Sequence, residues 1–106
     1  MEKKYFVLKT HGNRPSFPQD MNNEERAVMQ EHVTYWTGLA DKGTALLFGP
    51  VIEPEGTYGL GIIAIENEIE INSLFENDPA IKAGILSTKA FQMNAVLSKF
   101  WKIEKE

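Results

Sequence analysis

The chain has 106 residues, of which 42% are hydrophobic and 25% are charged, with a net charge of -4 and no cysteine. This length and composition predict one folded domain over residues 1–106, and they exclude a disordered, collagen-like or coiled-coil chain. The absence of cysteine excludes disulfides, thiolate nucleophiles and cysteine-ligated metal sites.

Charge and hydropathy also restrict the partners. The eleven lysine and arginine residues are scattered along an acidic chain, which would repel a phosphate backbone, so we expect no nucleic-acid partner. The longest apolar stretch, Gly59 to Ile65, is far shorter than the roughly 18 residues that a membrane-spanning helix needs. We therefore expect no membrane span. The N-terminus carries no apolar signal segment, and we expect a cytoplasmic protein.

The N-terminal part of the chain predicts a strand, a loop and a long helix. Residues 4–10 are β-branched and aromatic and place apolar side chains on both faces of a strand. Residues 11–21 contain glycine and proline without periodicity, which indicates an irregular loop. A cap at Asn22 or Asn23 begins a helix of about 19 residues that ends near Gly43.

The rest of the chain predicts two strands, a helix, a short helical turn and a last strand. These elements are expected over residues 44–51, 58–65, 68–75, 78–84 and 86–97, ahead of a charged tail from Lys102 to Glu106. A proline and a glycine between the first two strands suit a hairpin loop. Asp78 followed by Pro79 is a typical helix start.

The order β-α-β-β-α-β is the split βαβ pattern of ferredoxin-like domains. It predicts an α+β fold, a ferredoxin-like plait with an antiparallel four-stranded sheet and two helices on one face. Because the first strand is apolar on both sides, the face without helices would expose a hydrophobic patch. A second copy of the chain is the simplest cover, so we expect a homodimer joined through the sheet faces.

Several residues are candidates for a functional site. His32 lies on the apolar stripe of the long helix, where it is either a structural histidine or an acid-base group. Asp78 is expected to cap a helix start, and capping by itself would explain an aspartate at this position. Arg14, in the predicted loop, could clamp an anionic substrate or be a solvated side chain. His11, at a strand end, is expected on the surface.

Other patterns carry less information. Gly59-Leu60-Gly61 is a fragment of a dinucleotide motif that leads into a strand, so we interpret its glycines as sites of close packing or of a bulge. With two histidines far apart in the chain and no cysteine, a transition-metal site could form only from His32 and carboxylates, and we expect none. Trp36 and Phe48 are interpreted as core or pocket-wall residues.

A family resemblance adds to these observations. It rests on His32 followed by Trp36, Leu39, Ala40 and Gly43, then Phe48-Gly49-Pro50, and later Asp78-Pro79-Ala80-Ile81-Lys82-Ala83-Gly84. In this order and spacing the chain resembles the YciI-like (YCII-related) family over nearly its whole length. The resemblance implies a dimeric ferredoxin-like α+β barrel. It also implies an active site made of a helix histidine and the aspartate of the Asp-Pro turn, here His32 and Asp78.

If the resemblance holds, Asp78 could cap its helix with one oxygen while the other holds the imidazole N–H and fixes its tautomer. One hypothesis is then a small-molecule enzyme with lyase, isomerase or dehalogenase-like activity. In it His32 moves a proton, Asp78 orients the ring, Arg14 anchors an anionic substrate and no cofactor is needed. The alternative is a non-catalytic dimeric module that binds a small ligand or supports a partner protein, and the sequence leaves both open.

Overall fold

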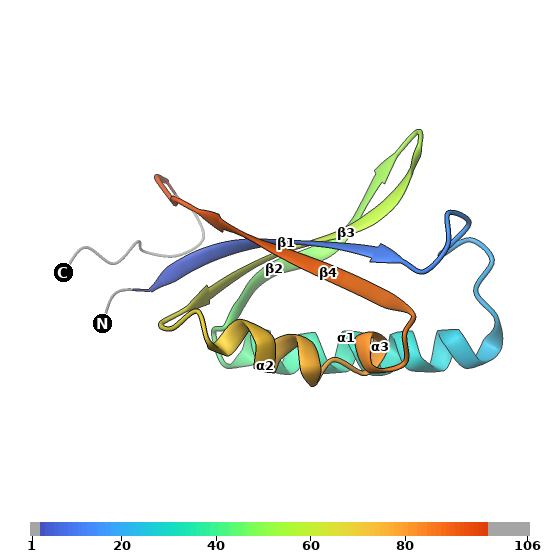
Figure 1. Ribbon diagram of the computed structural model, residues 1–106, viewed down its shortest axis with the longest axis horizontal. Coiled ribbons are helices and arrows are strands. Elements are labelled where there is room, and N and C mark those ends of the chain that lie inside the picture. Colours follow the sequence, from blue (N-terminus) through green and yellow to red (C-terminus); the bar gives the residue numbers. More distant parts are fainter. Residues whose placement is uncertain (1–2, 98–106) are drawn as a thin grey trace.

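The structure, a computed structural model, describes residues 3–97. A four-stranded antiparallel sheet is covered by helices on one face (Figure 1). The elements are β1 (Lys4–Gly12), α1 (Asn23–Asp41), β2 (Ala45–Glu53), β3 (Gly56–Ile65), α2 (Glu70–Glu76), α3 (Pro79–Lys82) and β4 (Leu86–Met93). The strand order β2-β3-β1-β4 confirms the ferredoxin-like plait.

Strand pairing explains where the boundaries differ from those expected. Strand β1 runs on to Gly12 because it pairs with β4 as far as Leu86. Strands β2 and β3 extend into the expected hairpin loop and leave only a tight turn between Glu53 and Gly56. Strand β4 ends at Met93, short of the expected residue 97, because the ladder with β1 ends at the pair Tyr5–Met93, one residue from the start of β1. Residues 94–97 carry no strand. The predicted tail, 102–106, lies outside the described residues.

Helix α1 begins as its sequence indicates. The Asn22 side chain accepts the backbone N–H of Glu25, and the Glu25 carboxylate accepts the backbone N–H of Asn22, which completes a capping box. The helix buries Trp36 and Leu39 against the sheet. The second half of this 19-residue helix thus packs on the sheet, which α1 covers from one side (Figure 1).

The main core lies between α1 and the sheet. Its buried members are Phe6, Leu8, Trp36, Leu39, Ala45, Ile63 and Ile65. Phe6 and Leu8 face the helices, as the alternation in β1 predicts, and Phe6 pairs across the sheet with Ile63. A smaller cluster under α1, which includes Phe17 and Ala80, fixes the loop after β1 and the start of α3.

Within residues 3–97, none of the helices combines the length and the apolar character that crossing a bilayer demands.

We expect Gly12→Ala to destabilise the fold. A Cβ atom at Gly12 would lie 2.6 Å from Cγ of the buried Phe17 and 2.7 Å from its Cβ. Because Phe17 or the end of β1 must shift, the free energy of unfolding should fall by about 1–3 kcal/mol. Gly49→Ala in β2 is the matched control, since nothing lies within 4 Å of a Cβ atom there. Urea denaturation of both variants checks this, and equal losses would contradict it.

Candidate active site

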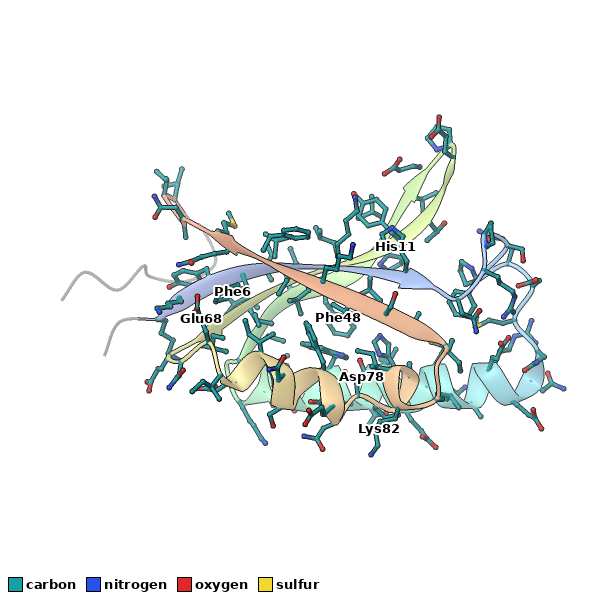
Figure 2. All side chains as sticks on the ribbon, in the orientation of Figure 1. Phe6, His11, Phe48, Glu68, Asp78 and Lys82 are labelled. Carbon is teal, nitrogen blue, oxygen red and sulfur yellow. The ribbon has the colours of Figure 1, made fainter. Side chains whose placement is uncertain are left out.

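A cavity of about 260 Å³ lies between the sheet and α1. Its wall is mainly apolar and includes Leu8, Phe17, Met29, Trp36, Phe48 and Leu86. His32 from α1 and Asp78 from the start of α3 also line it. Figure 2 shows Asp78 and Phe48 in the layer between the helices and the sheet. The candidate dyad is therefore part of the wall of a small, mostly hydrophobic cavity.

Asp78 is the most strongly held polar side chain of this wall. It is 1% exposed and caps α3, with Oδ1 accepting the backbone N–H of Ala80 at 2.9 Å. Its Oδ2 accepts the indole N–H of Trp36 at 2.7 Å. Both oxygens lie 2.9 Å from Nδ1 of His32. The structure thus brings His32 and Asp78 together, and the capping contact and the imidazole contact coexist.

The contact with Asp78 fixes which nitrogen of His32 is available. A carboxylate only accepts hydrogen bonds, so Nδ1 carries the proton and Nε2 keeps a lone pair in the neutral ring. No residue within 3–97 hydrogen-bonds Nε2, and the ring meets Phe48 edge-on, with centroids 6.4 Å apart. Nε2 is thus the ring nitrogen of the dyad that a ligand could engage.

Opposing effects set the charge of Asp78. Burial raises its pKa, but the hydrogen bonds from His32, Trp36 and Ala80, together with the charge of His32, outweigh burial, so the pKa lies below its ordinary value of 3.8. The carboxylate is therefore ionised at neutral pH. Burial of the Tyr35 side chain raises the pKa of its hydroxyl, and the charge of Asp78 raises it further. This hydroxyl donates to the backbone carbonyl of Leu74 at 2.7 Å.

Arg14 lies outside the lining of this cavity. Its guanidinium forms a bidentate pair with Glu25 at 2.8 Å and donates Nε–H to Asp20 at 2.9 Å. Further bonds reach the side chain of Asn13 and the backbone carbonyl of Asp20, so every N–H of the guanidinium has an acceptor. These contacts lower the pKa values of Glu25 and Asp20 and tie the loop after β1 to the start of α1. This geometry favours a structural role, and the predicted role of Arg14 as a substrate anchor stays a prediction.

Other sequence-based expectations have mixed outcomes. His11 is exposed and its ring stacks on Tyr58, as a surface position implies. Trp36 is both a core residue and a donor to Asp78. Of the two roles expected for Gly59 and Gly61, close packing holds at Gly59, where an added Cβ atom would lie 3.3 Å from Cβ of Thr10. The register shift lies in β2, between Ala45 and Leu47. The two glycines line the cavity floor, where their missing side chains leave room.

Sequence reasoning missed one polar feature of the wall. Thr10 of β1 and Thr88 of β4 both line the cavity, and their hydroxyl oxygens lie 2.8 Å apart. They are direct partners in the strand register. Alternation along each strand predicts which face of the sheet each threonine side chain lies on. Only the order of the strands in the sheet shows that the two side chains are in contact.

We expect Asp78→Asn to reduce stability and to flatten its dependence on pH. Because folding lowers the pKa of Asp78, the carboxylate stabilises the fold above its unfolded value of 3.8, and this contribution is lost as the pH falls through the folded pKa. The asparagine amide has one acceptor oxygen where the carboxylate has two, so at pH 7 an N–H donor of His32 or Trp36 loses its acceptor. This costs about 1–3 kcal/mol of stability.

Urea unfolding from pH 2 to pH 7 measures this difference. As the pH falls below 3.8, the free energy of unfolding should decrease more steeply for the wild type than for the variant. The pKa values of Asp20 and Glu25 are also lowered, but both residues are present in both proteins. Their contributions to the pH dependence therefore cancel when the two proteins are compared. Asp41→Asn, at the exposed end of α1, is the control. Parallel curves for the wild type and Asp78→Asn would contradict the assignment.

Comparison with known proteins agrees with this architecture. The chain is similar in structure to the 5-chloro-2-hydroxyhydroquinone dehydrochlorinase of Burkholderia phenoliruptrix, solved in complex with 2,5-dihydroxybenzoquinone. The TM-score is 0.56 at 20% sequence identity, and the match covers 84% of this chain and 93% of that one, which supports the fold. No curated protein matches the chain in sequence. A family model described as the YCII-related domain matches residues 5–93, and the chain belongs to this family.

Proposed function

We propose that the chain is a small-molecule enzyme in which His32 takes a proton from the substrate and returns it, while Asp78 orients the imidazole. The observation that supports this is a buried carboxylate, held by three N–H groups, beside a His32 ring whose Nε2 has no hydrogen-bond partner among residues 3–97 and lies at a cavity wall. An oriented imidazole beside an ionised carboxylate is a common acid-base arrangement.

The chemistry follows from one proton transfer. Nε2 of neutral His32 removes a proton from a C–H or O–H group, and the charge of Asp78 stabilises the imidazolium. The electron pair left on the substrate then has two routes. If it shifts and His32 returns the proton to a different atom, the reaction is an isomerisation. If it expels a leaving group, the reaction is a lyase or dehalogenase-like elimination. Neither route requires a cofactor.

The cavity favours a small and uncharged substrate. Among the described residues that line it there is no lysine or arginine, so an anionic group would find no fixed positive charge. A volume of about 260 Å³ accommodates a substituted six-membered ring, and Phe17, Trp36 and Phe48 supply aromatic walls. The dehydrochlorinase of similar fold binds a dihydroxybenzoquinone, which is consistent with a ring ligand here.

We expect His32→Gln to lose proton transfer. In D₂O, chlorohydroquinones and small cyclic ketones would be followed for deuterium uptake by NMR and for chloride release. The wild type should accelerate one of these reactions, and His32→Gln should be slower by about 10²–10⁴-fold, the range for general acid-base catalysis. His11→Gln, at the other histidine of the chain, should react like the wild type.

The imidazole NMR signals of His32 would also be recorded as a function of pH, with and without each of these compounds. A dependence on pH that changes when a compound is added supports a working site. Signals that respond to no compound, or equal rates for His32→Gln and the wild type, would contradict the proposal. Binding without any proton transfer would favour the alternative of a non-catalytic ligand-binding module.

We also propose that two copies of the chain pair through the sheet face without helices. Leu47, Ile62, Val7 and Phe91 are successive register partners across all four strands, so they form one apolar row on this face. Leu47 is 57% exposed and Phe91 54%. Met93, two residues along β4, extends the row. A row of this kind on a sheet face is typical of an interface.

Phe91→Glu should therefore yield monomers. Sedimentation equilibrium at micromolar concentration should give twice the chain mass of 12.0 kDa for the wild type and the single mass for the variant, because a charge would be buried in the interface. Ile69→Glu is the control, since Ile69 is also an exposed apolar residue but precedes α2 and lies outside the row. A monomeric wild type, or a dimeric Phe91→Glu variant, would rule out this interface.

A further inference from the structure

We infer that the hydroxyl pair of Thr10 and Thr88 is a second binding point of the cavity, which hydrogen-bonds one oxygen of a substrate whose other oxygen lies at His32. The inference rests on the proposed function, since it takes His32 as the partner of the other oxygen. It adds the substrate class: a small, uncharged ring compound that carries two oxygen groups.

The polar groups of the wall leave few free positions. The oxygens of Asp78 already accept from His32, Trp36 and Ala80, and the indole of Trp36 has no second N–H. Tyr58 turns its ring toward Lys9 and His11, on the sheet face without helices. A ligand in this cavity therefore meets mainly hydrocarbon, with the hydroxyl of Thr57, the Thr10–Thr88 pair and Nε2 of His32 as polar side-chain groups. Among them, only the Thr10–Thr88 pair presents two hydroxyls side by side.

The hydroxyl pair retains hydrogen-bonding capacity. Each hydroxyl has one hydrogen and two lone pairs, and the 2.8 Å contact between them uses one hydrogen and one lone pair. The pair thus keeps one donor and three acceptor positions. No other residue within 3–97 hydrogen-bonds either hydroxyl. A ligand oxygen could accept the free hydrogen, and a ligand hydroxyl could also donate back.

The surrounding backbone holds this pair open and in place. Thr10 and Thr88 are register partners within the β1–β4 ladder, and β-branched side chains have few rotamers in strands. Gly59 is the register partner of Thr10 on its other side. A Cβ atom at Gly59 would lie 3.3 Å from Cβ and 3.9 Å from the Cγ2 methyl of Thr10, so a side chain there would crowd the methyl side of Thr10. The glycine keeps that flank of Thr10 clear.

A Thr–Thr pair also occurs simply as a stabilising cross-strand contact. That role needs neither a position on a cavity wall nor a glycine beside it. Ligand affinity separates the two roles, because a purely structural pair would not distinguish ligands by their oxygens.

The test compares phenol, which has one oxygen, with hydroquinone and resorcinol, which have two. Dissociation constants would be measured by NMR titration of the isotope-labelled full chain. The wild type should bind at least one diol roughly three- to tenfold more tightly than phenol, the effect of one additional hydrogen bond. The double variant Thr10→Val/Thr88→Val should bind the diols and phenol with the same affinity.

Two controls address folding and specificity. Ser87→Ala removes the adjacent hydroxyl of β4, which is exposed, and should keep the preference for the diol. If the double valine variant fails to fold, Thr10→Ser/Thr88→Ser and Thr10→Val alone replace it. The serine variant retains both hydroxyls and should keep the preference, whereas Thr10→Val should reduce it.

Equal affinities for phenol and both diols in the wild type, a preference that survives in the double valine variant, or no binding of any of these rings would overturn the inference. The signals of His32 distinguish this failure from failure of the proposed function. If His32 responds to bound phenol but no diol is preferred, only the hydroxyl subsite is wrong. If the diol is preferred through the threonines while His32 does not respond, the hydroxyl pair binds an oxygen, but the placement of the other oxygen at His32 and the acid-base proposal are both wrong.

Discussion

The carboxylate of Asp78 is buried at the start of α3 and accepts N–H groups from two helices. His32 and Trp36 lie one turn apart on α1, and Ala80 lies in α3. A buried charge is costly to stability by several kcal/mol unless it is paired and hydrogen-bonded. This carboxylate therefore constrains the position of α3 on α1 and the orientation of the His32 ring at once. Stability and site geometry depend on the same atoms.

The cavity exists because the sheet and α1 do not fill the space between them at this point. Phe6, Ile63 and Leu39 pack the core on one side of the cavity. Beside them, two glycines of β3 place no side chains on the sheet, and Leu8 and Phe48 form the floor and wall instead. The result is a mostly apolar space in which a few polar groups decide what binds and what reacts.

The two faces of the sheet have different roles. The face toward the helices carries the core and the cavity, whereas the opposite face carries the apolar row from Leu47 to Phe91. Period-two alternation assigns the side chains of each strand to one face or the other, so a single strand such as β1 contributes to both. The loop after β1 is held by the ion pairs of Arg14 and packs Phe17 against Gly12 at the edge of the cavity.

The sequence by itself determined the local elements, their order and the inward face of α1, because caps, periodicity and turn residues act over a few positions. Asn22 and the Asp-Pro pair each specify a helix start through contacts within the next turn. The tertiary structure decided the contacts between distant residues. His32 and Asp78 are 46 positions apart, and Thr10 and Thr88 are 78 positions apart. Only helix packing and strand order bring such pairs together. No local pattern encodes that Arg14 pairs with Glu25, or that the two threonines line the cavity.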